Sequence, residues 1–357
     1  MKNNSPILKS TISLLLILTL SSALFLLPSC RVRTTPSDEL SFFAMDTFMT
    51  LKLYRGDHTA EETRAALSAA MDEIIRIEKL FSVTDPESEL SALNRGETLD
   101  QPSADIITLL SLCRELNITT SGIYDITIYP LMLAWGFTTD EGPSVPTAEE
   151  IEKALAQIDS QAVTVTLRED GGYSVNAGGA LLDLGSIAKG YAGQRAADLL
   201  RERGFDSGIL VLGGNVQTLG KKPDGSGFLV GIADPQAPEG VISTVSTDAL
   251  NGIFTAEAKD APASYAIVTS GTYQRNFTEN GKTYHHIMDP ITGYPCDNGL
   301  ASVTVICPNG AMADGLSTSL FLLGYEEAME YYRNHGGFEA IFIKENGEIM
   351  KTDGLSE

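Results

Sequence analysis

The stretch "ASVTVICPNGAMADGLSTSLFLLG", residues 301–324, joins two segments of different periodicity. Residues 301–308 are rich in β-branched side chains and end at a proline, which is the pattern of a buried strand. Residues 310–324 are apolar around most of each helical turn and end at a glycine, which predicts a helix. Together they predict a strand followed by a covering helix, which suits an α+β domain.

Three polar residues, Asp314, Ser317 and Thr318, interrupt this apolar helix. Asp314 and Thr318 lie four residues apart and therefore share one face of the helix. A carboxylate and a hydroxyl that point the same way can supply oxygen ligands to a hard cation such as Mg²⁺. A threonine that bonds back into its own helix, with the aspartate as a cap, explains the same residues. Spacing alone leaves both interpretations open.

The rest of the chain alternates strand-like and helix-like segments. Helices are expected at residues 60–80, 104–115 and 146–158, and strands at residues 40–54, 163–175, 208–220, 228–235 and 264–277. Residues 81–95 are rich in Asp, Ser and Pro, which is typical of a turn. Trp135 is the only tryptophan, and we expect it in the core.

The segment "LLDLGSIAKGYAGQRAADLLRERG", residues 181–204, predicts a strand, a tight glycine turn and a helix. The start of such a helix presents backbone N–H groups that favour an anion. Lys189 in its first turn either complements a phosphate or is merely solvated. The turn matches neither the GxGxxG nor the P-loop pattern. We therefore expect a single α+β domain with mixed sheets and covering helices, and not a Rossmann or P-loop fold.

Two of the chain's four histidines stand side by side in "YHHIMDPITGYP", residues 284–295. The preceding Asn280-Gly281 pair is a strong hairpin signal, so residues 284–288 are expected to continue a strand. Successive strand residues face opposite sides, so His286 and His285 cannot both face one pocket. A histidine beside the following Asp-Pro turn serves as a general base, a phosphate partner or a structural hydrogen-bond donor.

The charge and the cysteines exclude several classes of protein. The formal net charge is -22, which disfavours nonspecific binding to nucleic acid, so an anionic ligand needs a metal, backbone N–H groups or a placed lysine. Beyond Cys30 only Cys113, Cys296 and Cys307 remain. They are too few and too scattered for a disulfide framework or a structural zinc site, although one bridge of unknown pairing stays possible.

The first thirty residues are typical of an export signal, with lysines followed by an uncharged apolar run. The run ends in "LPSC", which resembles the lipobox of bacterial lipoproteins, so Cys30 is the expected lipidation site. A plain membrane anchor, or a cysteine there by accident, is the alternative. Residues 31–39 are expected to be a tether and residues 40–357 the folded domain.

Taken in order, eight blocks of the sequence resemble the ApbE family, the FAD:protein FMN transferases. The blocks are AMDTFMTL, FSVTDPESELSALNR, GIYDITIYPLMLAWGF, DLGSIAKGYA, LGGN, TSGTYQR, HHIMDPITGYP and SVTVICPNGAMADGLSTSLFLLG. Each block is weakly specific by itself, whereas their joint order over essentially the whole mature chain is highly specific. The resemblance favours a functional role for the polar helix face.

The resemblance implies a protein that binds FAD and Mg²⁺ and transfers FMN to a Thr or Ser hydroxyl of an acceptor protein, releasing AMP. The acceptors would be subunits of membrane redox complexes, and the protein would be lipid-anchored on the extracytoplasmic side of the cell membrane. If water is the acceptor, the same site is an Mg²⁺-dependent FAD pyrophosphatase that yields FMN and AMP. A non-enzymatic flavin-binding lipoprotein is a third possibility, although capture alone needs no cation at a diphosphate.

The resemblance also implies roles for individual residues. Asp314 and Thr318 are similar to the family's side-chain metal ligands, and Ala188 to its backbone ligand. The expected flavin-nucleotide contacts are Met45, Thr84, Ile123, Tyr124, Asp125, Gly185, Lys189, Tyr191 and Ile287. His286 and Asp289, in the family's HIxDPxTG pattern, are the expected catalytic residues.

Three positions depart from the family's pattern. Thr84 replaces an aromatic residue that commonly contacts the isoalloxazine, so flavin stacking is not expected there. Asn215 stands where an acidic residue is frequent, so a charge at that point is absent. Ser186 replaces the second glycine of a turn that approaches phosphate.

Overall fold

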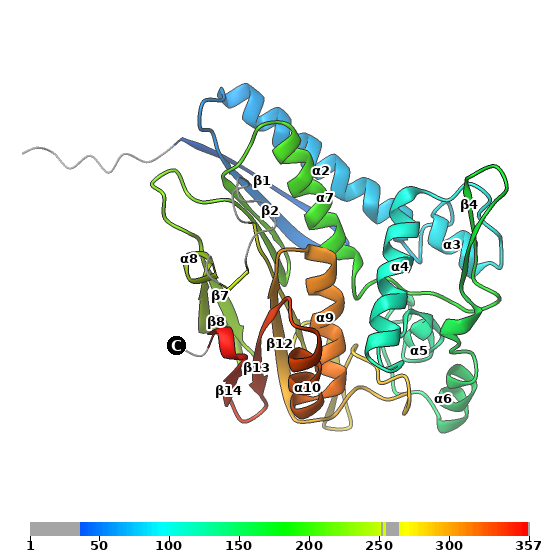
Figure 1. Ribbon diagram of the computed structural model, residues 1–357. Helices are drawn as coiled ribbons and strands as arrows, with labels where there is room; N and C mark the ends of the chain where they lie inside the picture. The colour runs from blue at the N-terminus through cyan, green and yellow to red at the C-terminus, as the bar shows by residue number, and fades with distance from the viewer. Residues whose placement is uncertain (1–35, 251–252, 255–263, 356–357) are drawn as a thin grey trace, which may run out of the picture. The chain divides into compact units, whose positions relative to one another are not determined.

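An antiparallel sheet of eight strands organises the protein in a computed structural model that describes residues 36–250, 253–254 and 264–355 (Figure 1). The expected export signal and Cys30 lie outside these residues. The strand order is β1-β2-β5-β6-β9-β12-β13-β14, and every neighbouring pair is antiparallel. The strands are β1 Ser37–Ala44, β2 Thr47–Tyr54, β5 Gly208–Leu212, β6 Asn215–Leu219, β9 Ala266–Gly271, β12 Leu300–Cys307, β13 Glu339–Lys344 and β14 Ile349–Lys351.

Four helices lie side by side over one face of this sheet (Figure 1). They are α2 Ala60–Phe81, α7 Ala188–Glu202, α9 Gly310–Leu323 and α10 Tyr325–His335. α7 packs between α2 and α9, and α10 packs on α9. α2 begins with a capping box in which Thr59 and Glu62 satisfy each other's backbone N–H groups.

A hairpin covers part of the sheet's other face. It consists of β7 Leu229–Asp234 and β8 Ala237–Ser246, and its buried residues Val230 and Ile232 belong to the same apolar cluster as Ile306 and Ile341 of the sheet. All eight residues of β12 are therefore buried, because helices cover one of its faces and the hairpin the other. A strand covered on both faces has a continuous apolar sequence, which is the pattern that predicted it.

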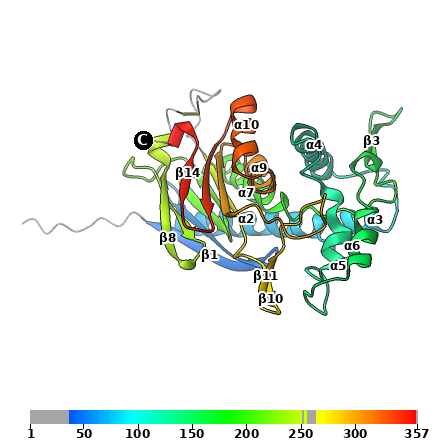
Figure 2. The ribbon, with the colours of Figure 1, turned by 90° about the horizontal axis from the view of Figure 1, so that it is seen from below.

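The segment that follows α2 forms a group of short helices away from the sheet (Figure 1 and Figure 2). Its elements are α3 Glu89–Asn94, α4 Ala104–Thr119, η1 Ile126–Ile128, α5 Tyr129–Ala134, α6 Ala148–Leu155, η2 Ser160–Ala162, β3 Thr164–Leu167 and β4 Tyr173–Asn176. Trp135 is fully buried in its apolar cluster, and its indole N–H donates to the carbonyl of Gly293 at 2.9 Å. The prediction that Trp135 belongs to the core is confirmed.

The remaining elements are short. They are α8 Thr247–Leu250, η3 Asp353–Leu355 and the hairpin of β10 Asn276–Glu279 and β11 Lys282–His285. Among the described residues, the structure contains no helix whose length and apolar content would suffice to cross a membrane. Cys113, Cys296 and Cys307 are free thiols.

The α+β expectation is confirmed, with sheets that are antiparallel between all described strands and not mixed, and three local predictions are wrong. The single strand expected at residues 40–54 is the hairpin of β1 and β2, which starts inside the expected tether. Its turn residues Met45 and Asp46 have φ of 49° and 58°, so the reversal uses neither Gly nor Pro and leaves no sequence signal. The expected turn at residues 81–95 contains α3, and no strand forms at residues 181–184.

Helices α7 and α9 approach each other closely at two glycines. A β-carbon on Gly190 would lie 2.5 Å from Cβ of Asp314 and would collide with the carbonyl oxygen of Gly310. A β-carbon on Gly310 would lie 2.5 Å from the carbonyl oxygen of Gly190. The helix spacing at this point therefore requires glycine on both sides.

We predict that Gly190→Ala lowers the free energy of unfolding by about 1–3 kcal/mol, because an extra methyl group must push the two helices apart. Gly193→Ala in the same helix is the control, since its nearest neighbour would be Cδ1 of Leu212 at an ordinary 3.5 Å. The control variant should be neutral or more stable, by up to about 1 kcal/mol. Urea denaturation measures both. Equal stability of the two variants would show that the helix contact is not tight.

Candidate functional site

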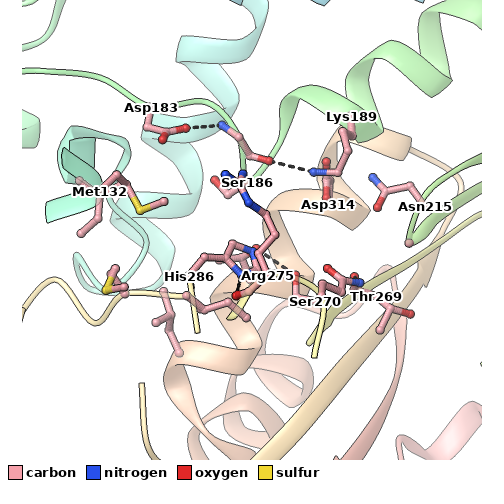
Figure 3. A pocket seen from close by; sticks show the side chains of 18 of the residues that line it. Met132, Asp183, Ser186, Lys189, Asn215, Thr269, Ser270, Arg275, His286 and Asp314 are labelled. Atoms are coloured by element: carbon pink, nitrogen blue, oxygen red, sulfur yellow. Dashed lines mark hydrogen bonds between the residues drawn. The ribbon is translucent and has the colours of Figure 1, made fainter. Parts of the chain in front are cut away.

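A pocket of about 380 Å³ lies where the group of short helices, the ends of the sheet strands, the first turn of α7 and one side of α9 meet (Figure 3). Polar atoms line much of it, and its acidic and basic side chains come from segments far apart in the sequence. Ten predicted site residues line this pocket: Met45, Ile123, Tyr124, Asp125, Gly185, Lys189, His286, Ile287, Asp314 and Thr318.

The turn between β1 and β2 forms one wall of the pocket through Met45, Asp46 and Thr47. The backbone N–H of Met45 donates to Oε1 of Glu78 on α2 at 2.6 Å. The positive φ of both turn residues is a conformation that most residues avoid, so this hydrogen bond helps to hold the turn. Gly213 of the β5–β6 turn packs against Thr47, where a β-carbon would lie 2.5 Å from the threonine Oγ1.

The segment before α7 forms a second wall. The carboxylate of Asp183 accepts from the N–H of Gly185 at 2.6 Å, a local bond that shapes the turn. Burial raises the pKa of Asp183, although the positive charges of Arg275 and Lys189 oppose the shift. The Lys189 ammonium donates to the carbonyl of Gly185 at 3.2 Å. The ion pairs among the described residues do not include Lys189, so its charge is available to a ligand.

Residues 123–125 reach the pocket from the end of α4. The hydroxyls of Tyr124 and Ser186 lie 3.0 Å apart, which joins this wall to the α7 turn. The carboxylate of Asp125 accepts from the N–H and the hydroxyl of Thr127, at 2.8 and 2.6 Å, and so caps the short helix η1. Ser186, which departs from the family's pattern, thus has a structural partner in Tyr124.

The polar face of α9 divides into a structural and a pocket-facing part. The Ser317 hydroxyl donates to the carbonyl of Asp314 at 2.8 Å and lies 2.7 Å from the hydroxyl of Ser270, so it bonds within the fold. Asp314 and Thr318 line the pocket instead. The carboxylate of Asp314 is 4% exposed and accepts from the N–H of Gly190 at 2.7 Å. Burial raises the pKa of Asp314.

The donor set on α9 fits a hard cation. Asp314 forms no ion pair with a described residue, and the groups around its buried carboxylate are the N–H of Gly190, the Asn215 amide and, beyond ion-pair distance, the Lys189 ammonium. The Thr318 hydroxyl lies one turn further along and bonds to Ser270 at 3.1 Å. A carboxylate with an adjacent hydroxyl is a partial oxygen ligand set of the kind that Mg²⁺ completes with water or phosphate. No cluster of three or more Asp, Glu, His or Cys side chains with metal-site geometry occurs in the described part of the chain.

The two histidines have different environments. β11 ends at His285, so the strand alternation expected through Met288 stops before His286, and both His286 and Ile287 line the pocket. His286 does line the pocket, but the predicted reason, alternation along a continuing strand, is wrong. His285 is buried, and its two ring nitrogens bond to the carbonyl of Cys296 at 3.0 Å and the N–H of Ile287 at 3.3 Å. His285 therefore serves the fold and does not line the pocket.

His286 keeps one ring nitrogen free. Its Nδ1 donates to the carbonyl of Arg275 at 3.2 Å, and because a carbonyl can only accept, the proton of the neutral ring is on Nδ1. Nε2 therefore carries a lone pair, with no described protein partner. Burial, together with the positive charges of Arg275 and Lys189, lowers the pKa of His286 to about 3. The ring is neutral at physiological pH and can accept a proton.

Four predicted residues do not line the pocket. Thr84 is exposed and bonds to Ser82, and the Asp289 carboxylate accepts from the N–H groups of Ile291 and Thr292 and from the Thr292 hydroxyl, so it shapes a turn. The Tyr191 hydroxyl donates to Asp105 at 2.7 Å, away from the pocket. Ala188 is buried as the first residue of α7. The structure thus places Asp289 outside the pocket lining, and its catalytic role stays a prediction.

Sequence reasoning did not assign Asp183, Asn215 or Arg275 to the site, although all three line the pocket. Asp183 and Arg275 belong to the quoted blocks "DLGSIAKGYA" and "TSGTYQR", so membership of these blocks is the sequence signal for both residues. Asn215 is 4% exposed, and its Nδ2 has no hydrogen-bond partner among the residues that the structure describes. The Asn215 amide faces Asp314 (Figure 3) and lowers the pKa of that carboxyl, but no hydrogen bond of normal distance and angle joins Nδ2 to the carboxylate. A buried donor without a partner is unfavourable by about 1–3 kcal/mol, which favours a ligand here.

Comparison with known proteins gives consistent matches over most of the chain. A model of the ApbE family matches residues 45–342. The FAD:protein FMN transferase of Klebsiella pneumoniae is 33% identical over 311 residues, covering 84% of this chain and 87% of that protein. The protein of the same name from Haemophilus influenzae is 30% identical over 300 residues, covering 82% of each chain.

Solved structures have the same fold. The crystal structure of the ApbE protein of Thermotoga maritima has a TM-score of 0.75 at 28% identity and covers 89% of this chain and 97% of that chain. The apo flavinyl transferase ApbE of Pseudomonas stutzeri has a TM-score of 0.73 at 27% identity, with 89% and 95% covered. Because the family model spans most of the sequence and the fold agrees, this chain belongs to the ApbE family.

Proposed function

We propose that this chain is an FAD:protein FMN transferase. It would move FMN from FAD to a Thr or Ser hydroxyl of an acceptor protein, with Mg²⁺, and release AMP. Family membership and the names of the relatives support the activity. The observation that carries the chemistry is the neutral His286, whose free Nε2 lies in the same pocket as Asp314 and Lys189.

The transfer requires a proton acceptor for the attacking hydroxyl. The hydroxyl oxygen attacks the phosphorus of the FMN half, its bond to phosphorus forms, and the bond from that phosphorus to the oxygen of the AMP half breaks. The electron pair leaves with AMP, and the hydroxyl proton passes to Nε2 of His286. The Nδ1 bond to Arg275 keeps the ring in the tautomer and orientation that this step needs.

The charge of the diphosphate must be offset in an acidic chain. Asp314 and Thr318 would hold the Mg²⁺, with the Ala188 carbonyl as the further ligand that the family resemblance implies. When bound, the cation supplies Lewis-acid stabilisation of phosphate oxygens. Lys189 adds a positive charge from the first turn of α7. Met45, the residues 123–125 and Ile287 provide the walls against which the nucleotide would pack.

The apolar N-terminal run and "LPSC" support a lipid-anchored location on the extracytoplasmic side of the cell membrane. An enzyme anchored there reaches acceptors in the same compartment, which suits subunits of membrane redox complexes. Residues 31–35 would then connect Cys30 to the folded part, which begins at β1.

Removal of the buried carboxylate tests the cation site. We predict that Asp314→Asn lowers kcat/KM for FAD roughly 100- to 1,000-fold, which corresponds to a loss of about 3–4 kcal/mol of transition-state stabilisation. It should also abolish the rise in melting temperature that Mg²⁺ gives the wild type. The variant should fold, because the Asn oxygen can still accept from Gly190. Asp170→Asn, on an exposed turn outside the pocket, is the control. An Asp314→Asn variant with full activity and an intact Mg²⁺ response would exclude this site.

Replacement of the neutral histidine tests the base. We predict that His286→Asn lowers kcat by about 100- to 10,000-fold while FAD binding persists, because a donor remains near the Nδ1 position and only the proton acceptor is lost. His285→Ala should instead lower stability with a smaller loss of kcat, since both its ring nitrogens serve the fold. Equal losses of kcat in the two variants would contradict the assignment.

The pH profile gives a second measure of His286. Only the neutral ring accepts a proton, so activity is lost as the pH falls through its pKa. Because that pKa is lowered to about 3 in the free protein, we predict that kcat/KM shows no fall attributable to His286 around the ordinary histidine pKa of about 6.5. The rate is measured with FAD and an acceptor protein between about pH 5 and about pH 8. A fall near the ordinary pKa that the His286→Asn variant lacks would overturn the prediction.

The membrane location has its own test. We predict that Cys30→Ser shifts the full chain from the membrane fraction to the soluble periplasmic or medium fraction, because the acyl chains are absent. Labelling with a radioactive fatty acid should mark the wild type and not the variant. If the variant stays in the membrane fraction and the wild type is unlabelled, the N-terminal run is a plain membrane anchor.

A further inference from the structure

Arg275 links the base to the rest of the pocket. It lies between β9 and β10, and its carbonyl accepts from both the backbone N–H and the Nδ1 of His286, at 3.1 and 3.2 Å. The His286 ring is therefore fixed to the backbone of the residue whose side chain lines the same pocket. Figure 3 shows the Arg275 side chain among the pocket residues, beside His286 and directed toward the segment of Ser186.

The guanidinium of Arg275 is only partly used by the fold. Its Nη2 donates to the carbonyl of Phe137 at 2.7 Å, and the described residues offer it no ion-pair partner. Asp183 is near enough for the positive charge to lower that carboxyl's pKa, but no hydrogen bond joins the two. The remaining N–H groups of the fork are free to bind a ligand.

Three groups with unused N–H donors therefore meet in this pocket. They are the Arg275 fork, the Lys189 ammonium, whose one hydrogen bond is to the carbonyl of Gly185, and the buried Nδ2 of Asn215. Two cations without carboxylate partners are notable in a chain with a formal net charge of -22. A planar guanidinium can hold two phosphate oxygens at once, which a lysine cannot do.

We propose that Arg275 is a catalytic residue that contacts the diphosphate of the dinucleotide together with Lys189, and stabilises the negative charge that develops as the phosphorus–oxygen bond to the AMP half breaks. This inference rests on the proposed transferase function. Arg275 would thereby place the cleaved bond beside His286, because one residue holds both the phosphate and the ring.

Three variants of the full chain test the proposal. Arg275→Gln removes the charge and the fork, Arg275→Lys keeps the charge alone, and Arg114→Gln removes an exposed arginine of α4 outside the pocket. Initial rates of AMP release and of FMN transfer are measured with FAD, Mg²⁺ and an acceptor protein. We expect Arg275→Gln to lower kcat by about 100-fold or more, as the loss of a charge-stabilising donor does elsewhere. Arg275→Lys should recover only part of the loss, and the control should match the wild type.

Two readouts separate this role from an anchoring role through Phe137. Added guanidinium ion should restore part of the activity of Arg275→Gln and leave the wild type unchanged, because the free ion can occupy the vacated phosphate site. The groups that lower the pKa of His286 by their charge are Arg275, Lys189 and His285. The acid limb of kcat/KM should therefore move to higher pH in Arg275→Gln and stay in place in Arg275→Lys.

The outcomes are distinguishable. A wild type that turns over FAD while Arg275→Gln keeps its kcat overturns the inference and leaves the transferase function intact. A fall in activity that guanidinium does not relieve, with a lowered melting temperature and an unchanged acid limb, assigns Arg275 to the fold and also overturns it. A wild type that releases neither AMP nor FMN-labelled acceptor overturns the proposed function together with the inference.

Discussion

The backbone N–H of Gly190 donates to the carboxylate of Asp314 at 2.7 Å, and the geometry of the pocket depends on this contact. The bond forms because α7 and α9 meet at Gly190 and Gly310, where neither position has room for a β-carbon. It holds a carboxylate that is 4% exposed at the helix junction, beside the first turn that carries Lys189. A wider helix spacing would let water reach Asp314 and would separate the acidic and basic groups that the pocket brings together.

Burial has opposite effects on the two ionisable groups that matter most. It raises the pKa of Asp314, which makes a bound cation favourable, and it lowers the pKa of His286, which keeps the ring neutral. The positive charge of Lys189 opposes the rise in the pKa of Asp314, and the charges of Arg275 and Lys189 both add to the fall in the pKa of His286. The same local excess of positive charge thus suits a diphosphate and preserves a proton acceptor, although the chain as a whole is strongly acidic.

The sheet contributes to the site through its turns and strand ends. The β1–β2 turn holds Met45 and Asp46 in a backbone conformation of positive φ, and the Met45 N–H bond to Glu78 ties it to α2. The β5–β6 turn packs against it at Gly213. Asn215 follows directly as the first residue of β6, so its buried amide is placed by strand pairing and not by a local motif. The turns therefore set the local backbone conformation of pocket residues, and the pairing of distant strands brings these turns together at one edge of the sheet.

The sequence by itself determined the fold class and the family, and it predicted those pocket residues whose chemistry shows in local patterns, such as Asp314 and Thr318 one helical turn apart. Of the two histidines only His286 lines the pocket, but the strand argument that separated them failed because β11 ends at His285. Only the tertiary structure showed that both nitrogens of His285 are occupied and that Asp289 serves its own turn. It alone brought Arg275, Asn215 and Asp183 to the pocket. The reason is physical: periodicity and turn signals describe neighbours along the chain, whereas burial, hydrogen-bond satisfaction and pKa depend on segments that meet only when the sheet and helices pack.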